Sequence, residues 1–270
     1  MKRELNSPDN LLLDTAETTA RKVGKWLLTQ FGNARVHEKG ETHNLVTEAD
    51  VEAERQICET LHKVLPEAVF LREEGESTGD EESEEVWIID PLDGTNNFAH
   101  GIPQFAVSIA LVVAGHFQLG VIYDPNRDEL FSAYRGHGAW LNGRPIQVSQ
   151  RATIQQSVVC TGFYYDRGQL VKTTLAAIDR LFATNVRGIR RFGSAALDLC
   201  WVASGRLDGY FEYQLGTWDY AAGALIVQEA GGKCSARDGS PLQVNSKSMI
   251  ASNAAIHTAL VDLVRWPESE

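Results

Sequence analysis

The sequence predicts an α+β protein with an antiparallel sheet in its first part and a mixed α/β arrangement in its second part. Two stretches before residue 65 repeat apolar residues with the period of an α-helix. Short runs of β-branched and aromatic residues, separated by turn residues, then follow up to about residue 145. After residue 150, strand-like and helix-like stretches alternate, which favours a sheet covered by helices.

A change in composition at residues 149–151 marks the predicted boundary between the two parts. A chain of 270 residues can bury a substantial core, either as one large domain or as two small ones. We expect an N-terminal α+β domain, residues 1–150, and a C-terminal α/β domain, residues 151–270.

The first predicted helix covers residues 10–31, where apolar residues recur every three or four positions: Leu12, Leu13, Ala16, Ala20, Val23, Leu27 and Leu28. Gly32 is expected to end it, and residues 33–46 are expected to form a polar loop. A Thr-x-x-Asp pattern at residues 47–50 is typical of a capping box, and it opens a second helix that runs to about residue 64.

Residues 86–98 read Val-Trp-Ile-Ile-Asp-Pro-Leu-Asp-Gly-Thr-Asn-Asn-Phe, and the functional argument begins there. The apolar start of this stretch predicts a strand buried on both faces. The strand is expected to end at Asp90, because Pro91 cannot donate to a neighbouring strand. Gly94 permits a sharp reversal, and Thr95 is expected to cap a short helix.

The remaining elements follow from the same signals. Further strands of the first part are expected at residues 69–71, 105–113, 117–123 and 129–134, and Asn142-Gly143 predicts a hairpin turn. Strands of the second part are expected at residues 157–161, 186–190, 209–213, 233–235 and 249–251. Its helices are expected at residues 169–182, 193–203, 218–230 and 254–265, and Thr217 is expected to cap the third of them.

Composition restricts the partners. The net charge of −11 and the pI near 5.1 argue against nucleic acid or an anionic membrane as the main partner. We expect no signal peptide and no spanning helix, because no apolar run approaches the roughly 20 residues that a span needs. The four cysteines have no Cys-x-x-Cys spacing, so a reducing cytoplasm is the expected setting, with Cys160 and Cys200 in the core.

The chemistry of the central stretch follows from its turn. Asp90 and Asp93 are brought close together, and their carboxylates repel each other unless one is protonated or a cation lies between them. Two carboxylates and the Leu92 carbonyl form an all-oxygen set that suits Mg²⁺. The amides of Gly94 and Thr95 suit an anionic oxygen. A cation site beside an anion site is what hydrolysis of a phosphate ester requires.

A simpler interpretation remains open at this point. Asp-Gly is a common turn pair, and Asp90 could be only a solvated strand end. An EF-hand is excluded, because counting from Asp90 places Gly101 where the bidentate glutamate should stand.

Two segments resemble the signatures of a known family. Residues 90–98, Asp-Pro-Leu-Asp-Gly-Thr-Asn-Asn-Phe, closely resemble the first signature of the inositol monophosphatase family of Mg²⁺-dependent, lithium-sensitive phosphatases, and residues 216–232 resemble the second. The resemblance implies a layered αβαβα sandwich of the sugar-phosphatase type and a homodimer. Haloacid-dehalogenase phosphatases space their two aspartates two apart. Here the spacing is three, which argues against a phosphoaspartyl mechanism.

The resemblance also implies a metal-ligand set. Glu73, Asp90 and the Leu92 carbonyl would hold a first Mg²⁺, and Asp90, Asp93 and Asp219 would hold a second. Glu73 would help to hold a third ion through water, so the expected cofactor is two to three Mg²⁺ ions. Asp219 has an alternative explanation, because a carboxylate is favoured in the first turn of any helix.

The implied catalytic residues are Thr95, Asp50 and Glu73, with Thr95 and Asp50 orienting the attacking water. Lys39 matches a lysine placed near the outermost metal or the phosphate. Asp50 could instead only cap its helix, and Lys39 could be an ordinary loop lysine. The chain departs from the family pattern on both sides of Glu73: Arg72 stands where a glycine or small residue is usual, and Gly75 stands where Ser or Thr is usual.

The implied substrate-binding residues are Gly94, Thr95, Gly193, Ser194, Ala195, Glu212 and Lys39. Glu212 matches a carboxylate that contacts a substrate hydroxyl, although it could be an ordinary surface residue. Inositol monophosphate or a similar small polyol phosphate is the expected substrate, and histidinol phosphate and fructose bisphosphate are the alternatives. A regulatory protein that keeps this fold but acts through protein contacts is the alternative of another class.

Overall fold

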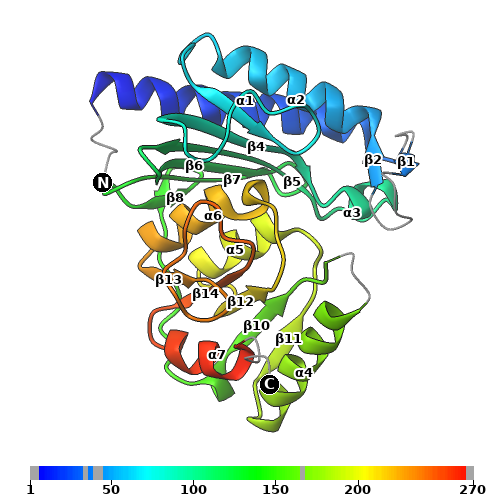
Figure 1. The fold of residues 1–270 in the computed structure, drawn as a ribbon, viewed down its shortest axis with the longest axis vertical. Coiled ribbons are helices and arrows are strands. Elements are labelled where there is room, and N and C mark those ends of the chain that lie inside the picture. The colour runs from blue at the N-terminus through cyan, green and yellow to red at the C-terminus, as the bar shows by residue number, and fades with distance from the viewer. Residues whose placement is uncertain (1–5, 33–35, 39–44, 165–167, 266–270) are drawn as a thin grey trace.

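The computed structural model describes residues 6–32, 36–38, 45–164 and 168–265, and it forms five layers (Figure 1). Two N-terminal helices cover one face of a seven-stranded sheet. Two helices from the second half lie between that sheet and a five-stranded sheet, whose outer face is covered by two further helices, Gln169–Ala183 and His257–Val264. The predicted layered α+β class is therefore confirmed. Lys39 lies outside the described residues.

The first layer contains α1 (Ser7–Gln30) and α2 (Glu48–Leu61), which pack against each other and against the large sheet. Between them, β1 (Val36–Glu38) and β2 (Leu45–Thr47) pair antiparallel. The prediction that residues 33–46 form only a polar loop is therefore wrong. Both strands are only three residues long, too short for a periodic pattern to reveal.

The large sheet has its strands in sequence order: β3 (Val69–Arg72), β4 (Glu85–Asp93), β5 (Ala106–Val113), β6 (His116–Asp124), β7 (Glu129–Tyr134), β8 (Ala139–Leu141) and β9 (Arg144–Pro145). All neighbours are antiparallel except β3 and β4, which are parallel. The prediction of an antiparallel sheet therefore fails only at this edge. The predicted hairpin forms, and both of its turn residues have positive φ, 48° at Asn142 and 76° at Gly143.

The second half begins with a short 3₁₀ helix, Ile154–Gln156, that the sequence did not predict. Its strands are β10 (Val158–Thr161), β11 (Gly188–Arg190), β12 (Gly209–Glu212), β13 (Gly232–Ser235) and β14 (Met249–Asn253), in the order β11-β10-β12-β14-β13. The sheet is mixed, as predicted. Its helices are α4 (Gln169–Ala183), α5 (Ala195–Ala203), α6 (Thr217–Glu229) and α7 (His257–Val264).

The inner helix α6 approaches both the large sheet and α5 closely, because a glycine lies at each contact. At Gly120 of β6, an added Cβ would come within 2.6 Å of the Ala222 carbonyl of α6. At Gly223, it would come within 2.5 Å of the Leu199 side chain of α5. Alternation along β4 divides its apolar residues between two cores: Trp87 and Ile89 pack with α1 and α2, and Val86 and Ile88 pack with α5 and α6.

The end of β4 differs from its prediction. The strand continues through Pro91 to Asp93, and its register against β5 shifts between Asp90 and Asp93. Gly94 is the N-cap of α3 (Thr95–Ala99), with φ 101°, so Thr95 is the first helical residue and the prediction that it is the cap is wrong. Gly94 is required because an added Cβ would lie 2.9 Å from the Gln104 carbonyl. The register shift and the turn place the two aspartates at the carboxyl end of β4.

In the part of the chain that the structure describes, no helix has both the length and the apolar composition needed to cross a membrane. Cys160 and Cys200 are fully buried, as predicted.

Candidate active site

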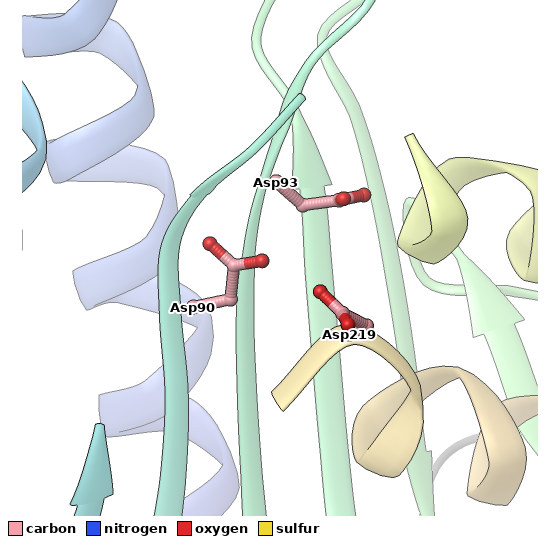
Figure 2. A group of neighbouring side chains, drawn as sticks. All are labelled: Asp90, Asp93 and Asp219. Atoms are coloured by element: carbon pink, nitrogen blue, oxygen red, sulfur yellow. The ribbon is translucent and has the colours of Figure 1, made fainter. Parts of the chain in front are cut away.

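Three aspartates meet between the large sheet and the inner helices (Figure 2). Asp90 and Asp93 leave the end of β4, and Asp219 rises toward them from the first turn of α6. One oxygen of each lies within 4.8 Å of the others. The cluster therefore joins parts of the chain that are about 130 residues apart in sequence.

The three carboxyl groups are held in a place that disfavours their charge. Burial raises the pKa of Asp90 well above its usual range, and the charges of Glu73, Asp93 and Asp219 raise it further. Burial raises the pKa of Asp219 in the same way, with Glu73 and Asp93 adding to the effect. No ion pair within the described residues includes Asp90, Asp93 or Asp219. A closely spaced, uncompensated set of carboxylate oxygens fits a hard divalent cation.

Asp93 is fixed by the start of α5. Its carboxylate accepts hydrogen bonds from the Ser194 hydroxyl, the Ala195 amide (3.3 Å) and the Ala196 amide (2.8 Å). Burial raises the pKa of Asp93 to about 6, although these hydrogen bonds act in the opposite direction. Ser194 is also the N-cap of α5, because its hydroxyl accepts from the Leu197 amide. The polar groups at this helix start therefore orient Asp93 instead of pointing freely into the cavity.

Asn97 ties the same turn to the second half of the chain. Its amide nitrogen donates to the carbonyls of Gln104 and Phe192, each at 2.8 Å, and of Gly193 at 3.2 Å. The side chain is 5% exposed. Asn97 lies in the first signature, but its residue type and position predicted no role for it. Its function is to hold the β4 turn against the segment that leads into α5.

Thr95 lies between two oxygen acceptors. Its hydroxyl is 3.0 Å from Asp50 Oδ1 and 3.0 Å from the Leu92 carbonyl. Asp50 is fully buried in the first turn of α2, so the structure brings this predicted pair together. The Leu92 carbonyl, which belongs to the predicted all-oxygen set, thus lies within hydrogen-bond distance of the Thr95 hydroxyl.

These residues surround a cavity of about 510 Å³. Of the predicted site residues, the cavity is lined by Glu73, Asp90, Leu92, Asp93, Asp219, Gly94, Thr95, Gly193, Ser194, Ala195 and Glu212. Asp50 lies behind Thr95 and is not part of the lining. Glu73 faces Asp90 from the end of β3, but it is not one of the three residues whose oxygens converge.

The start of α6 corrects another prediction. Gly216 is the N-cap, and Thr217 is the first residue of the helix. Asp219 accepts a hydrogen bond from the Gly216 amide at 2.6 Å. Asp219 therefore stabilises the start of its helix, in agreement with the alternative explanation for a carboxylate at this position. It also belongs to the acidic cluster.

A second acidic pair lines the wall of the cavity. Burial raises the pKa of Glu212 to about 7, and the Tyr210 hydroxyl donates to this carboxylate at 2.7 Å. Asp198 on α5 is 2% exposed, and its Oδ2 accepts from the Cys160 thiol at 3.1 Å. Burial also raises the pKa of Asp198 well above its usual range. Glu212 was predicted as a site residue and Asp198 was not.

Two basic side chains, those of Arg191 and Lys247, also line the cavity. Neither was predicted as a site residue from the sequence. Asp198 could have been noticed as the one charged residue in the otherwise apolar helix Ala195–Ala203. Arg191 stands two residues before the glycine that leads into the same helix, which is a weak signal. Lys247 lies in a loop between β13 and β14, and nothing in its local sequence indicates the site.

Comparison with known proteins agrees with this architecture. The model of the inositol monophosphatase family matches residues 10–266. The inositol-1-monophosphatase of Synechocystis is 43% identical over 94% of this chain and 89% of its own length. The Nus factor SuhB of Haemophilus influenzae is 39% identical over 95% of this chain and 96% of its own length.

A solved structure gives the same result for the fold. The crystal structure of the extragenic suppressor protein suhB from Bartonella henselae superposes with a TM-score of 0.89 at 42% identity, covering 96% of this chain and all of that one. The match to the family model and to these relatives extends over nearly the whole sequence. The chain therefore belongs to the inositol monophosphatase family of phosphatase enzymes.

Proposed function

We propose that this chain is a Mg²⁺-dependent phosphomonoesterase that hydrolyses inositol monophosphate or a similar small polyol phosphate. The observation that carries the proposal is the convergence of Asp90, Asp93 and Asp219 on the 510 Å³ cavity. The family is metal-dependent, and several of the relatives are named inositol-1-monophosphatase.

The donor set fits Mg²⁺ because it consists of oxygens only and has excess negative charge. Asp90, Asp93, Asp219, Glu73 and the Leu92 carbonyl would hold two to three ions. Bound Mg²⁺ supplies Lewis acidity, which neutralises charge on the phosphate and lowers the pKa of water. Such a cation would also offset the repulsion between a phosphate monoester and a protein of net charge −11.

The chain's own residues position the reactants. Asp50 accepts a hydrogen bond from the Thr95 hydroxyl, so the lone pairs of the Thr95 oxygen can accept a hydrogen bond from a water molecule at the cavity wall and orient it. Gly94 and Thr95, at the start of α3, hold the phosphate through their amides. No side chain is assigned as a nucleophile, so we expect direct transfer of the phosphoryl group to water and inversion at phosphorus.

Glu212 supports a polyol as the rest of the substrate. A carboxylate at the cavity wall accepts hydrogen bonds from substrate hydroxyl groups, and Gly193, Ser194 and Ala195 complete that wall. Histidinol phosphate and fructose bisphosphate remain the alternative substrates, because the same acidic cluster would serve them equally. The predicted domains, residues 1–150 and 151–270, both contribute to this site, and we propose that the enzyme is cytoplasmic and homodimeric.

A function through protein contacts is the second candidate. Relatives of comparable identity are named Nus factor SuhB, which is the observation that favours it. The acidic cluster favours the enzyme, since a purely protein-binding role makes no use of it.

The test is phosphate release from inositol, fructose, histidinol and adenosine phosphates, measured with Mg²⁺ and with a chelator in its place. We expect one polyol phosphate to be the preferred substrate and the chelator to abolish turnover. Full activity in the chelator, or no release from any substrate with Mg²⁺ present, would refute the proposal. The variants Asp90→Asn and Asp219→Asn each remove one carboxylate of the acidic cluster. Their matched control is Asp238→Asn, which changes an exposed aspartate outside the cavity.

A further inference from the structure

We propose that Glu54 is a positioning residue that fixes the turn carrying Glu73 against the acidic cluster. The inference builds on the proposed function, because its readout is the binding of Mg²⁺. Glu54 lies on α2, one helical turn after Asp50, so the two carboxylates stand on the same face of that helix. Glu54 is 3% exposed and Asp50 is fully buried. A helix that buries two carboxylates on one face needs partners for both.

Asp50 has its partner in Thr95, and Glu54 has its partners in the turn after β3. Glu54 Oε2 accepts a hydrogen bond from the Glu74 amide at 3.0 Å. Glu54 Oε1 lies 3.8 Å from Arg72 Nη1, which makes an ion pair. The residues on both sides of Glu73 are thus attached to the same side chain of α2.

The outer part of this turn is held separately. The Phe70 amide donates to the Thr78 hydroxyl at 2.8 Å, and the Arg72 amide donates to the Ser77 hydroxyl at 3.2 Å. These bonds fix the ends of the loop, but neither reaches Glu73. The hydrogen bond from the Glu74 amide to Glu54 restrains the residue that directly follows Glu73. Glu73 itself lines the cavity and acts electrostatically on Asp90.

The positions at which this chain departs from the family pattern fit the same arrangement. Arg72 stands where a small residue is usual, and its guanidinium compensates the buried charge of Glu54. Gly75 stands where Ser or Thr is usual. A Cβ there would lie 2.6 Å from Glu54 Oε1 and 3.1 Å from Arg72 Nη1. The two departures are therefore linked, because the Arg72–Glu54 pair occupies the space that a side chain at position 75 would need.

The experiment measures Mg²⁺ affinity by titration calorimetry on the full chain, together with kcat at saturating Mg²⁺. In Glu54→Ala we expect the Kd for Mg²⁺ to rise by about tenfold or more, as is typical when the support of a metal ligand is removed. Glu54→Gln keeps an acceptor for the Glu74 amide, so it should recover most of the affinity. Saturating Mg²⁺ should restore kcat in both variants, because Glu54 does not touch the reacting groups.

Gly75→Ala tests the linkage without removing a charge. It should raise the Kd for Mg²⁺ in the native background. In the Glu54→Ala background it should have no further effect, because the 2.6 Å contact with Glu54 is then absent and the Arg72 side chain, released from its ion pair, can move away from the added methyl group. Ile57→Val is the matched control: it destabilises the same helix in the core, away from the turn, and should leave Mg²⁺ affinity unchanged.

The outcomes are distinguishable. A Glu54→Ala variant that is folded by circular dichroism and binds Mg²⁺ within twofold of the native chain would overturn the inference. So would equal effects of Gly75→Ala in the two backgrounds. If the native chain itself bound no Mg²⁺, the proposed function would fail instead, and the variants would not be needed to show it.

Discussion

Asp93→Asn should abolish turnover and yet make the metal-free protein more stable at neutral pH. Asp93 is buried, and its pKa is raised from 3.8 to about 6, so the folded protein bears a cost whenever this carboxylate is ionised. Because the folded pKa is higher than the unfolded one, the folded state binds the proton more tightly between these values. Stability therefore falls as pH rises from about 4 to about 6 and stays lower above that range.

The magnitude follows from the shift and from the hydrogen bonds. A rise of about two pKa units corresponds to about 3 kcal/mol at pH 8, where the native carboxylate is ionised. Asparagine can accept from Ser194 and Ala196 through its carbonyl oxygen and loses only the 3.3 Å bond from Ala195, which costs about 1 kcal/mol. The net gain is about 2 kcal/mol, or a rise in Tm of roughly 4–8 °C.

The assay is thermal unfolding in a chelator, measured from pH 4 to pH 8 for the native chain and the variant. The gain should disappear near pH 4, because the native Asp93 is then protonated and no longer bears the cost. The variant should be slightly less stable than the native chain there, by up to about 1 kcal/mol, because it still lacks the bond from the Ala195 amide. Mg²⁺ should stabilise the native chain more than the variant. Asp208→Asn is the matched control. Asp208 is also fully buried, but its carboxylate pairs with Arg151, so this variant should be less stable than the native chain. A loss of stability in Asp93→Asn at pH 8 would refute the reasoning.

Three further predictions concern the same cavity. The Kd for Mg²⁺ should rise as pH falls below about 6, because Asp93 gains a proton that the metal must displace. Titration calorimetry from pH 5 to 8 measures this dependence, and a Kd that does not change with pH would contradict the prediction. Thr95→Ala should lower kcat by about 100-fold or more, whereas Thr95→Ser should retain most activity because it keeps the hydroxyl beside Asp50; steady-state kinetics at saturating Mg²⁺ decide. Glu212→Gln should raise KM for a polyol phosphate about tenfold and leave p-nitrophenyl phosphate unaffected, and equal losses on both substrates would exclude a role in specificity.

Local patterns predicted most of the secondary structure, because periodicity and turn residues act over a few positions. The caps were wrong for a physical reason. Thr95 and Thr217 have good capping side chains, but the residue before each is a glycine that takes the non-helical conformation first. Their side chains then face into the protein, and Thr95 bonds to Asp50 and Leu92.

The site was predictable to the extent that its residues lie in recognisable motifs. The two signatures contain Asp90, Asp93 and Asp219, which the structure brings together. Contacts between distant segments could not be read in the same way: Ser194 bonds to Asp93 across 101 positions, and Glu54 bonds to the Glu74 amide across 20. Such contacts depend on how α2 and α5 are placed against the sheet, which periodicity does not specify.

The acidic cluster also bears on whether the fold is used for catalysis or only for protein contacts. Relatives with both kinds of name share this architecture, so overall similarity cannot separate the two. The cluster can, because burying Asp93 in ionised form alone costs about 3 kcal/mol, a sizeable part of the stability of a typical protein. Asp90 and Asp219 add to that cost in the same direction. A surface used for protein contacts gains nothing from it, whereas a bound cation offsets it directly. The electrostatic cost of the metal-free state is therefore the physical reason to regard the chain as a metal-dependent enzyme first.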